Sequence, residues 1–321
     1  MIISITHELD LDGLGSQAIV RRFFIKIKGE KTDRIKFYYA HYTNFMEIVK
    51  KTLKVIPTNG YIIISDIGFN DEFLALFPLF KEIRKKNCKI FWFDHHIIDE
   101  HIERKLNRSI DVYINDPTRC SAEIVKDYYL RDDSIAIKIA SFSRDSDFHT
   151  KLYDTATNLQ SIIAFNRGNK SNKNKRKVVE FMSEGIFEND WYNDQLAKIK
   201  VWEENESTFA LKHRKIIEVE EFGNLVISFA KIGGGKIVRL LKDYFPNLKL
   251  YIGIDVRYNE IVIHSDYVNC RELARIFKGG GHKNRAGFSY SKAFAKINEL
   301  SKEFLSIIKE SIYKFKNHNI E

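Results

Sequence analysis

The stretch Lys89-Ile90-Phe91-Trp92-Phe93-Asp94-His95-His96 decides the fold expected of this chain. Its apolar part, residues 90–93, predicts a buried strand, and an acid and two imidazoles follow where that strand ends. Open α/β sheets bind their ligands at the carboxyl ends of their strands. The stretch therefore predicts both an open α/β sheet and a functional site at its edge.

Two earlier apolar runs end in the same way. Residues 1–6 run into His7, Asp10 and Asp12, and residues 61–65 end at Asp66. If these strands are parallel neighbours, their carboxyl ends meet at one edge and the side chains converge there. Helices are expected at 13–27, 45–53, 70–86 and 135–142, and further strands at 35–39 and 111–114. This alternation predicts an α/β fold with a doubly wound, mostly parallel sheet.

Carboxylates crowd the predicted site. Like charges in a confined site raise each other's pKa, so these acids could not all stay ionised without a counter-charge. Divalent cations supply it most simply. Carboxylate oxygens together with imidazole nitrogens suit Mn²⁺, and Mg²⁺, Fe²⁺, Co²⁺ and Zn²⁺ remain open. The alternative is that these strand-end acids and histidines are structural or solvated.

These residues carry a family resemblance. The pattern His7-x-x-Asp10-x-Asp12-Gly13, Ser65-Asp66 and Asp94-His95-His96 resembles motifs I to III of the DHH phosphoesterase superfamily. Residues 277–288, Phe-Lys-Gly-Gly-Gly-His-Lys-Asn-Arg-Ala-Gly-Phe, resemble the glycine-rich signature of the DHH-associated domain. The order and separation of the two also match. The resemblance implies a DHH catalytic metal-binding domain at 1–165, a basic loop and helical connector at 166–220, and a smaller α/β substrate-binding domain at 221–321.

The resemblance also implies hydrolysis of a phosphodiester with two metal ions. One ion would take His7, Asp10 and Asp66, and the other would take Asp12, Asp66, His95 and Asp145, so that Asp66 joins them. Asp147 lies two residues further on and stays open as the alternative to Asp145. Asp94 would orient a ligand imidazole and His96 would contact a phosphate oxygen, which makes this pair the expected catalytic residues.

Glycines and basic residues near the C-terminus are the expected substrate site. Glycine lets a backbone approach a ligand closely and expose its N–H groups to an anion. By resemblance, the residues that hold the terminal phosphate or nucleotide are Gly279, Gly280, Gly281, His282, Arg285 and His264. Arg285 stands where a small residue is common, and His264 stands where an arginine often reaches the substrate. The substrate length or the phosphate position is therefore expected to differ here.

The implied activity is that of a Mn²⁺-dependent oligoribonuclease, or nanoRNase, which degrades short RNA to 5′-mononucleotides. The Asp-Thr-Gly turn of the A-type enzymes is missing after Asp145, so the chain is more similar to the B type. A pAp phosphatase, a cyclic dinucleotide phosphodiesterase and a RecJ-like single-strand exonuclease remain open. The alternative of another class is a regulator that binds nucleotides without turnover.

Composition is typical of a cytoplasmic enzyme. The chain has 321 residues, 44% of them hydrophobic, without the ~20 consecutive apolar residues of a membrane span or a signal segment. A net charge of +9 favours anionic partners, here short single-stranded RNA or nucleotides, and a homodimer is left open. The three cysteines at 88, 120 and 270 are far apart, so no disulfide framework is expected.

Two local features complete the expectations. Residues 166–177 contain neither an acid nor a large apolar side chain and predict a solvated loop, or alternatively a basic arm that attracts phosphate. Ser121 follows the turn at Asp116-Pro117 and is expected to cap the next helix.

Overall fold

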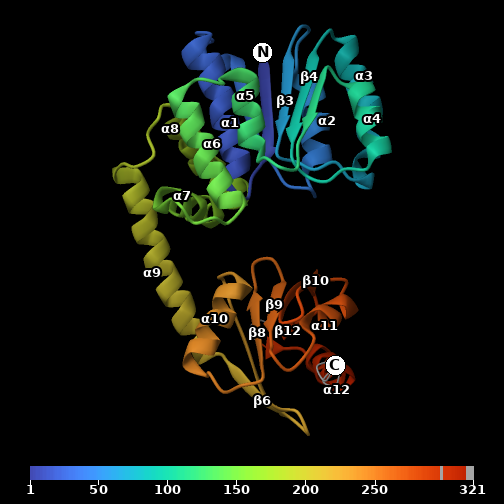
Figure 1. The fold of residues 1–321 in the computed structure, drawn as a ribbon, viewed down its shortest axis with the longest axis vertical. Helices are drawn as coiled ribbons and strands as arrows, with labels where there is room; N and C mark the ends of the chain where they lie inside the picture. Colours follow the sequence, from blue (N-terminus) through green and yellow to red (C-terminus); the bar gives the residue numbers. More distant parts are fainter. Residues whose placement is uncertain (297–298, 316–321) are drawn as a thin grey trace. The chain divides into compact units, whose positions relative to one another are not determined.

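The computed structural model describes residues 1–296 and 299–315. The chain divides into two compact units, Met1–Ile199 and Lys200–Glu321. The division falls inside helix α9, Asp190–Lys212, which runs without a break for 23 residues (Figure 1). Among the described residues there is no helix of the length and apolarity that crossing a bilayer requires.

The first unit is built on five parallel strands in the order β2-β1-β3-β4-β5. Their bounds are β1 Ile2–His7, β2 Ile35–Ala40, β3 Tyr61–Ser65, β4 Lys89–Asp94 and β5 Val112–Asn115. This confirms the predicted parallel α/β sheet. After β2 the chain returns past β1 to the other side, so the strand order reverses between β1 and β3. Ligands bind at the carboxyl edge of such a reversal, because the connecting loops there leave in opposite directions.

Helices cover both faces of this sheet (Figure 1). Their bounds are α2 Phe45–Val55, α3 Leu76–Lys85 and α4 Glu100–Ser109 on one face, and α1 Leu11–Arg21, α5 Ser121–Tyr129, α6 Ser134–Asp147, α7 Asp154–Phe165 and α8 Asn172–Ser183 on the other. Alternate strand residues point to opposite faces, so the neighbours Trp92 and Phe93 of β4 lie in different cores. Such burial on both faces explains why the strand is apolar throughout.

The basic run at 166–177 differs from its prediction. Residues from Asn172 onward form α8 instead of a solvated loop, and Lys175 is fully buried. The cause is an apolar stripe: Val178, Val179 and Met182 are buried in the core of the first unit, and Lys175 lies one helical turn before this stripe on the same side. Helix α8 and the start of α9 thus belong to the first unit, and a shorter part of the segment connects the units.

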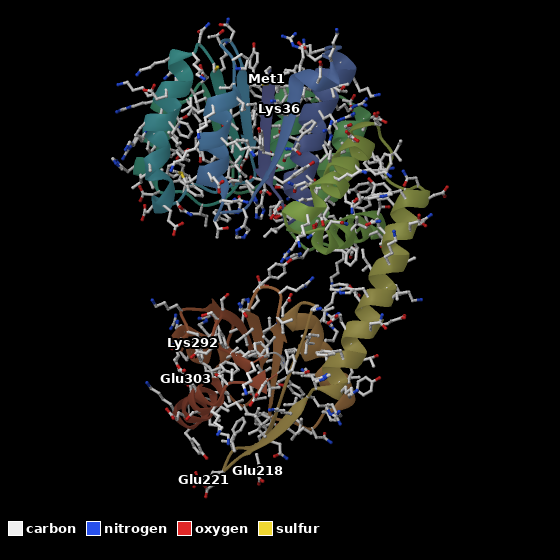
Figure 2. All side chains as sticks on the ribbon, turned by 180° about the vertical axis from the view of Figure 1, so that it is seen from behind. Met1, Lys36, Glu218, Glu221, Lys292 and Glu303 are labelled. Carbon is white, nitrogen blue, oxygen red and sulfur yellow. The ribbon has the colours of Figure 1, made fainter. Side chains whose placement is uncertain are left out.

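The second unit has a six-stranded sheet in the order β10-β11-β9-β8-β7-β6, in which β7 and β8 are parallel. The strands are β6 Lys215–Val219, β7 Gly223–Ala230, β8 Leu250–Asp255, β9 Glu260–His264, β10 Gly280–Gly281 and β11 Arg285–Ser289. The helices are α10 Gly234–Tyr244, α11 Cys270–Ile276 and α12 Lys302–Phe315, and a small ribbon pairs β12 Phe294–Lys296 with β13 Glu299–Leu300. Strand β6 falls in the segment predicted to be a helical connector; Figure 2 labels Glu218 and Glu221 at the hairpin that it forms with β7.

Candidate metal centre

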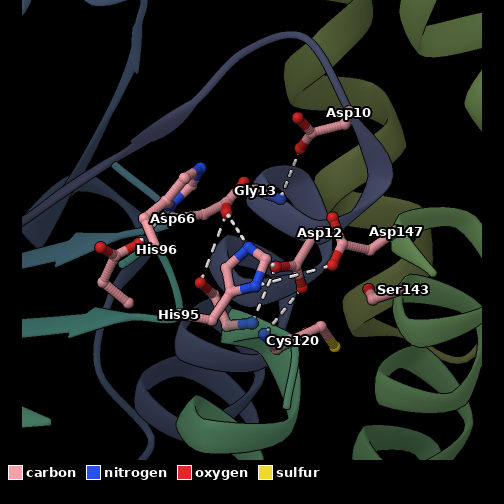
Figure 3. A network of polar contacts seen from close by, with 12 residues as sticks. Asp10, Asp12, Gly13, Asp66, His95, His96, Cys120, Ser143 and Asp147 are labelled. Carbon is pink, nitrogen blue, oxygen red and sulfur yellow. Dashed lines mark hydrogen bonds and ion pairs between the residues drawn. The ribbon is translucent and has the colours of Figure 1, made fainter. Parts of the chain in front are cut away.

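The loop after β1 is closed by a local cap. Asp10 precedes α1 and accepts a hydrogen bond from the Gly13 N–H at 3.0 Å (Figure 3). Its other oxygen lies 2.7 Å from His7 Nδ1. A side chain at Gly13 would place its Cβ 2.3 Å from the carbonyl oxygen of His7. Glycine is therefore required for α1 to start this close to the end of β1.

Asp66 lies between two imidazoles. It follows β3 with a backbone φ of 57°, a conformation that non-glycine residues keep only where the surroundings impose it. Its Oδ2 is 3.6 Å from His7 Nδ1 and its Oδ1 is 3.4 Å from His95 Nε2. Within the described chain, Asp66 Oδ2 and His7 Nε2 are buried without a hydrogen-bond partner. Buried polar atoms are rarely left so, and a cation would satisfy both.

Asp12 is held by the start of α5. Its two oxygens accept hydrogen bonds from the backbone N–H groups of Ser121 and Ala122, at 2.7 and 2.8 Å. The partial positive charge of a helix start stabilises a carboxylate there. The expectation that Ser121 caps this helix is wrong, because Cys120 occupies the N-cap. The sequence pattern did not predict this role of α5, since backbone N–H groups leave no residue-type signal.

The donor atoms form three overlapping groups, each with its atoms within 4.8 Å of one another. The groups are His7, Asp10 and Asp66; Asp66, His95 and His96; and Asp12, His95 and Asp147. Distances of 3.4–3.8 Å between imidazole and carboxylate atoms are too long for good hydrogen bonds. They are the spacing of two ligands that each lie about 2.1 Å from one cation. The residues therefore fit divalent metal ions, with Asp66 and His95 each shared.

The charges of this cluster are unbalanced without cations. Burial, together with Asp10 and Asp12, raises the pKa of Asp66 well above its usual range, and burial raises the pKa of Asp12 to about 6. Burial lowers the pKa of His7, but the hydrogen bond to Asp10 and the nearby negative charges of Asp10 and Asp66 outweigh it and raise the value to about 10. Protons thus take up part of the negative charge in the metal-free protein.

Comparison with known proteins identifies the first unit. Residues 1–145 match the DHH family, N-terminal domain. This N-terminal part of the chain is similar to the N-terminal domain of the DHH family. The matched residues include all the strand ends that deliver the clustered side chains of β1, β3 and β4, which confirms the resemblance to DHH phosphoesterases.

Two solved structures with TM-scores above 0.5 have a similar fold. The DHH domain structure of a member of a family of ribosomal proteins is similar with a TM-score of 0.58 at 15% identity, over 98% of this chain and 87% of that chain. A pGpG-specific phosphodiesterase from Vibrio cholerae is similar with a TM-score of 0.51 at 12% identity, over 98% of each chain. An uncharacterized Helicobacter pylori protein matches at 18% identity and a TM-score of 0.46, over 99% of each chain. No curated protein matches in sequence.

Of the two acids near the end of α6, Asp147 is the one that lies in the metal cluster. Its Oδ2 is 3.6 Å from His95 Nδ1 (Figure 3). The carboxylate of Asp145 instead accepts hydrogen bonds from the Thr150 hydroxyl and from the N–H groups of Leu152 and Tyr153. Residues two positions apart in an α-helix are about 200° apart around the helix axis, so Asp145 and Asp147 face opposite sides of α6. Of the two alternatives left open by the sequence, the geometry therefore favours Asp147 over Asp145 as the candidate metal ligand.

Substitutions of these two acids should have different effects. We expect Asp147→Asn to weaken metal binding by about 10–100-fold and to leave the melting temperature of the metal-free protein within a few degrees of the wild type. Asp145→Asn should lower the free energy of unfolding by about 1–3 kcal/mol, because the loop N–H groups of Leu152 and Tyr153 and the Thr150 hydroxyl lose a charged acceptor, and should keep metal binding. Metal titration and urea unfolding of both variants check this. A loss of metal binding in Asp145→Asn alone would reverse the assignment.

Asp94 fixes one histidine of the Asp-His-His motif. It is buried, and its Oδ1 lies 2.8 Å from His96 Nδ1, which raises the pKa of His96. Asp94 was expected to orient the imidazole of a metal ligand. In the structure, the imidazole that it contacts is that of His96 and not that of His95. The His96 side chain is 41% exposed, so Nε2 can reach a bound molecule. Carboxylates that hold the other nitrogen of a functional imidazole in this way set its orientation.

A buried ion pair supports the loop after β1. Lys175 of α8 is fully buried and pairs with Glu8, the residue after His7. The Lys175 ammonium also donates to the carbonyl of Gly168 at 3.2 Å and lies 5.0 Å from the ring centre of Tyr39. Since Glu8 is between His7 and Asp10, the ion pair ties the metal-binding loop to α8. The sequence alone did not distinguish Lys175, because it stands among other basic residues.

Metal binding should release protons. The metal-free protein keeps His7 protonated up to a pH of about 10 and Asp12 up to about 6, whereas ligands must be deprotonated. Metal affinity should therefore rise with pH, by about tenfold per pH unit for each proton released. We expect about one proton per cluster between pH 7 and 8, measured by calorimetry in buffers of different ionisation enthalpy. An affinity that is constant over this range would contradict protonation of His7.

The expected substrate residues are all in the second unit. Gly280 and Gly281 form β10, and a hairpin turn at His282 leads into β11, which starts at Arg285. Gly281 has a φ of 140°, which favours glycine. His282 is exposed. A Cβ at Gly279 would approach the Gly287 carbonyl oxygen to 2.3 Å, so this glycine serves close packing.

Arg285 and His264 are register neighbours in β11 and β9. The Arg285 guanidinium lies over Gly235 at the start of α10, where a Cβ would be 2.6 Å from it. Lys242 Nζ is 2.7 Å from His264 Nε2, and burial and Lys242 lower the pKa of His264. Lys242, in the last turn of α10, was not among the residues expected from the sequence. Together these groups form a basic cluster on the second unit.

Proposed function

We propose that this protein is a metal-dependent phosphodiesterase that hydrolyses short oligoribonucleotides to 5′-mononucleotides. The match to the DHH family supports the coarser class, a hydrolase of phosphate esters. The observation that carries the proposal is the position of Asp66, whose oxygens face His7 and His95. Asp66 would be shared by two cations, which when bound would stabilise the charge of a transferred phosphoryl group.

Mn²⁺ is the cation that we propose. The clustered ligands are carboxylate oxygens and imidazole nitrogens, and the described cluster contains no thiolate. This donor set suits Mn²⁺, while Mg²⁺, Co²⁺ and Fe²⁺ are the alternatives. When bound, the two cations would lower the pKa of a water molecule and neutralise charge on the phosphoryl oxygens.

The chain's own residues would orient the substrate. Asp94 holds His96 through Nδ1, and the raised pKa of His96 favours the imidazolium, which can donate from Nε2 to a non-bridging phosphate oxygen. Asp12 stays fixed because α5 binds both of its oxygens. Both groups are therefore set in place before the substrate binds, which lowers the cost of reaching the reactive geometry.

A short, linear substrate is the choice that the chemistry favours. The net charge of +9 suits a polyanion. Arg285, which lies over the start of α10, and Lys242, which lies in the last turn of α10 beside His264, suit a terminal phosphate. One fold neighbour is described as specific for pGpG, a dinucleotide. We therefore propose RNA fragments of a few nucleotides, each with a terminal phosphate, as the substrate class.

A time course tests the proposal. Purified protein with Mn²⁺ would receive 5′-phosphorylated dinucleotides and longer RNA, with pAp, cyclic di-AMP and single-stranded DNA in parallel. We expect the linear dinucleotides to be hydrolysed fastest. If pAp, the cyclic dinucleotide or long DNA is hydrolysed faster, the protein is still a phosphoesterase, but its substrate is not short RNA. If the metal-loaded protein hydrolyses none of these substrates, the proposal is wrong and the alternative of a nucleotide-binding regulator is favoured.

His282→Ala tests the substrate role of the second unit. Loss of one hydrogen bond to a charged phosphate should raise KM by about tenfold or more and leave kcat unchanged when the bond is equally strong in the transition state. His101→Ala removes an exposed histidine from α4 and is the matched control. Steady-state kinetics on a 5′-phosphorylated dinucleotide give both constants. An unchanged KM would remove His282 from the substrate site.

A further inference from the structure

The first unit has a cavity at the opposite edge of its sheet from the metal centre. It measures about 500 Å³, within the usual range for small-molecule pockets. Met1 and Ile2 at the start of β1 line it, whereas His7 ends that strand roughly 17 Å from Ile2. Figure 2 labels Met1 at this edge. None of the residues in the metal-binding groups lines this cavity.

Aromatic side chains line the cavity, and each ring contacts the next so that they form a closed circuit around it. Neighbouring ring centres around the circuit are 4.9–6.4 Å apart, in T-shaped or tilted contacts. The circuit runs through Phe24, Tyr61, Phe91, Tyr128 and Tyr129, and Phe23 packs on it from the side. Tyr61 and Tyr128 are 38% and 44% exposed although they are large rings. A flat aromatic ligand would cover these ring surfaces by stacking.

The helix that carries Phe23 and Phe24 changes its winding at the cavity. Helix α1 passes directly into a π-helical turn, Arg22–Ile27, a rare element that occurs frequently at functional sites. After it, Gly29 adopts a φ of 69°, and the Glu30 N–H donates to the Phe24 carbonyl at 2.9 Å. This bond folds residues 28–30 back over the π-helical turn. The chain's own hydrogen bonds thereby form the rim of the cavity.

The rim favours an anion. Lys28 and Arg34 line the cavity with a single acid, Glu30, which pairs with Arg34 at 3.4 Å. The Lys28 ammonium lies 5.3 Å from the ring centre of Phe23. Two cations beside one acid disfavour a quaternary ammonium ligand, which aromatic cages otherwise bind. The amide of Asn59 is also in the lining and can hydrogen-bond the edge of a base.

We infer that this cavity is a second binding site, for a nucleotide whose base stacks in the aromatic circuit and whose phosphate lies at Lys28 and Arg34. The inference goes beyond the proposed function and does not rest on it, because it uses no residue of the metal centre.

Equilibrium binding to the full chain tests it. The probes are 5′-GMP and 5′-AMP, with guanosine and inorganic phosphate as halves of the ligand, in EDTA so that the metal centre is empty. We expect one mononucleotide per chain at this site and much weaker binding of either half. Tyr128→Ala should weaken mononucleotide binding by about tenfold, and Arg34→Gln by about fivefold.

Matched variants separate the cavity from other surfaces. Tyr258→Ala changes a tyrosine of similar exposure in the second unit, and Arg104→Gln changes an exposed arginine with a similar pair four residues away. Both should bind like the wild type. Tyr128→Ala and Arg34→Gln should keep normal turnover without added mononucleotide, so failure of this inference is distinct from failure of the proposed function.

Three results would overturn the inference. The first is absence of mononucleotide binding in EDTA. The second is binding that Tyr128→Ala and Arg34→Gln leave intact but Asp66→Asn or His282→Ala removes. The third is a dimer, seen by sedimentation, that Tyr128→Ala dissociates while mononucleotide binding is unchanged, because the rings would then be covered by a second copy of this chain.

Discussion

Asp66→Asn should abolish turnover and at the same time stabilise the metal-free protein. Loss of the shared ligand removes charge stabilisation worth several kcal/mol, so we expect kcat/KM to fall by about three orders of magnitude. Asparagine tolerates the left-handed backbone at φ 57°, so the loop conformation is retained. Turnover and metal content of the purified variant are the measurements.

The stability gain has a definite sign. In the native protein, burial together with Asp10 and Asp12 raises the pKa of Asp66 above its unfolded value. An acid shifted in this direction costs stability once the pH exceeds its unfolded pKa, and the cost grows as the pH rises towards its folded pKa. The uncharged asparagine avoids this cost, so the melting temperature in EDTA should exceed that of the wild type at neutral pH and above.

Asp132→Asn is the control for Asp66→Asn, because it changes an exposed acid of the same unit. It should leave turnover, metal content and melting temperature unchanged. Turnover of Asp66→Asn close to that of the wild type, at normal metal content, would refute the shared-ligand assignment. A lower melting temperature in EDTA would refute the electrostatic argument and leave the metal assignment standing.

Lys175→Met should be the most destabilising of these substitutions. It leaves the carboxylate of Glu8 buried without its partner, which costs about 3–5 kcal/mol of unfolding free energy. Because Glu8 follows His7, we also expect metal affinity to fall by about 10–100-fold. Urea unfolding in EDTA and metal titration of the refolded protein give the two values.

Two further variants make the result specific. Arg176→Met changes the neighbouring residue of α8, whose pair with Glu180 is exposed, and should cost less than about 1 kcal/mol. The double variant Glu8→Leu with Lys175→Met removes both charges and should recover most of the lost stability. If the double variant is no more stable than Lys175→Met, then lost packing and not the unpaired charge explains the effect.

The sequence determined the sheet and most of the metal cluster. Apolar runs that end in acids and imidazoles are local patterns, and parallel strands bring their carboxyl ends to one edge whatever lies between them. These patterns alone were enough to name His7, Asp10, Asp12, Asp66 and His95, and the fold brings all five together.

The tertiary structure decided what depends on packing between segments far apart in the chain. Asp145 and Asp147 are equivalent as sequence, and the packing of α6 on α1 and α5 selects which one faces His95. The N–H groups that hold Asp12 belong to backbone, which has the same chemistry at every residue. Lys175 is one of several lysines in a basic run, and it is buried only because α8 packs on α1 with that side inward. The local sequence pattern determines which chemical groups stand at a strand end. The rotation of each packed helix about its own axis determines which of its side chains face that strand end.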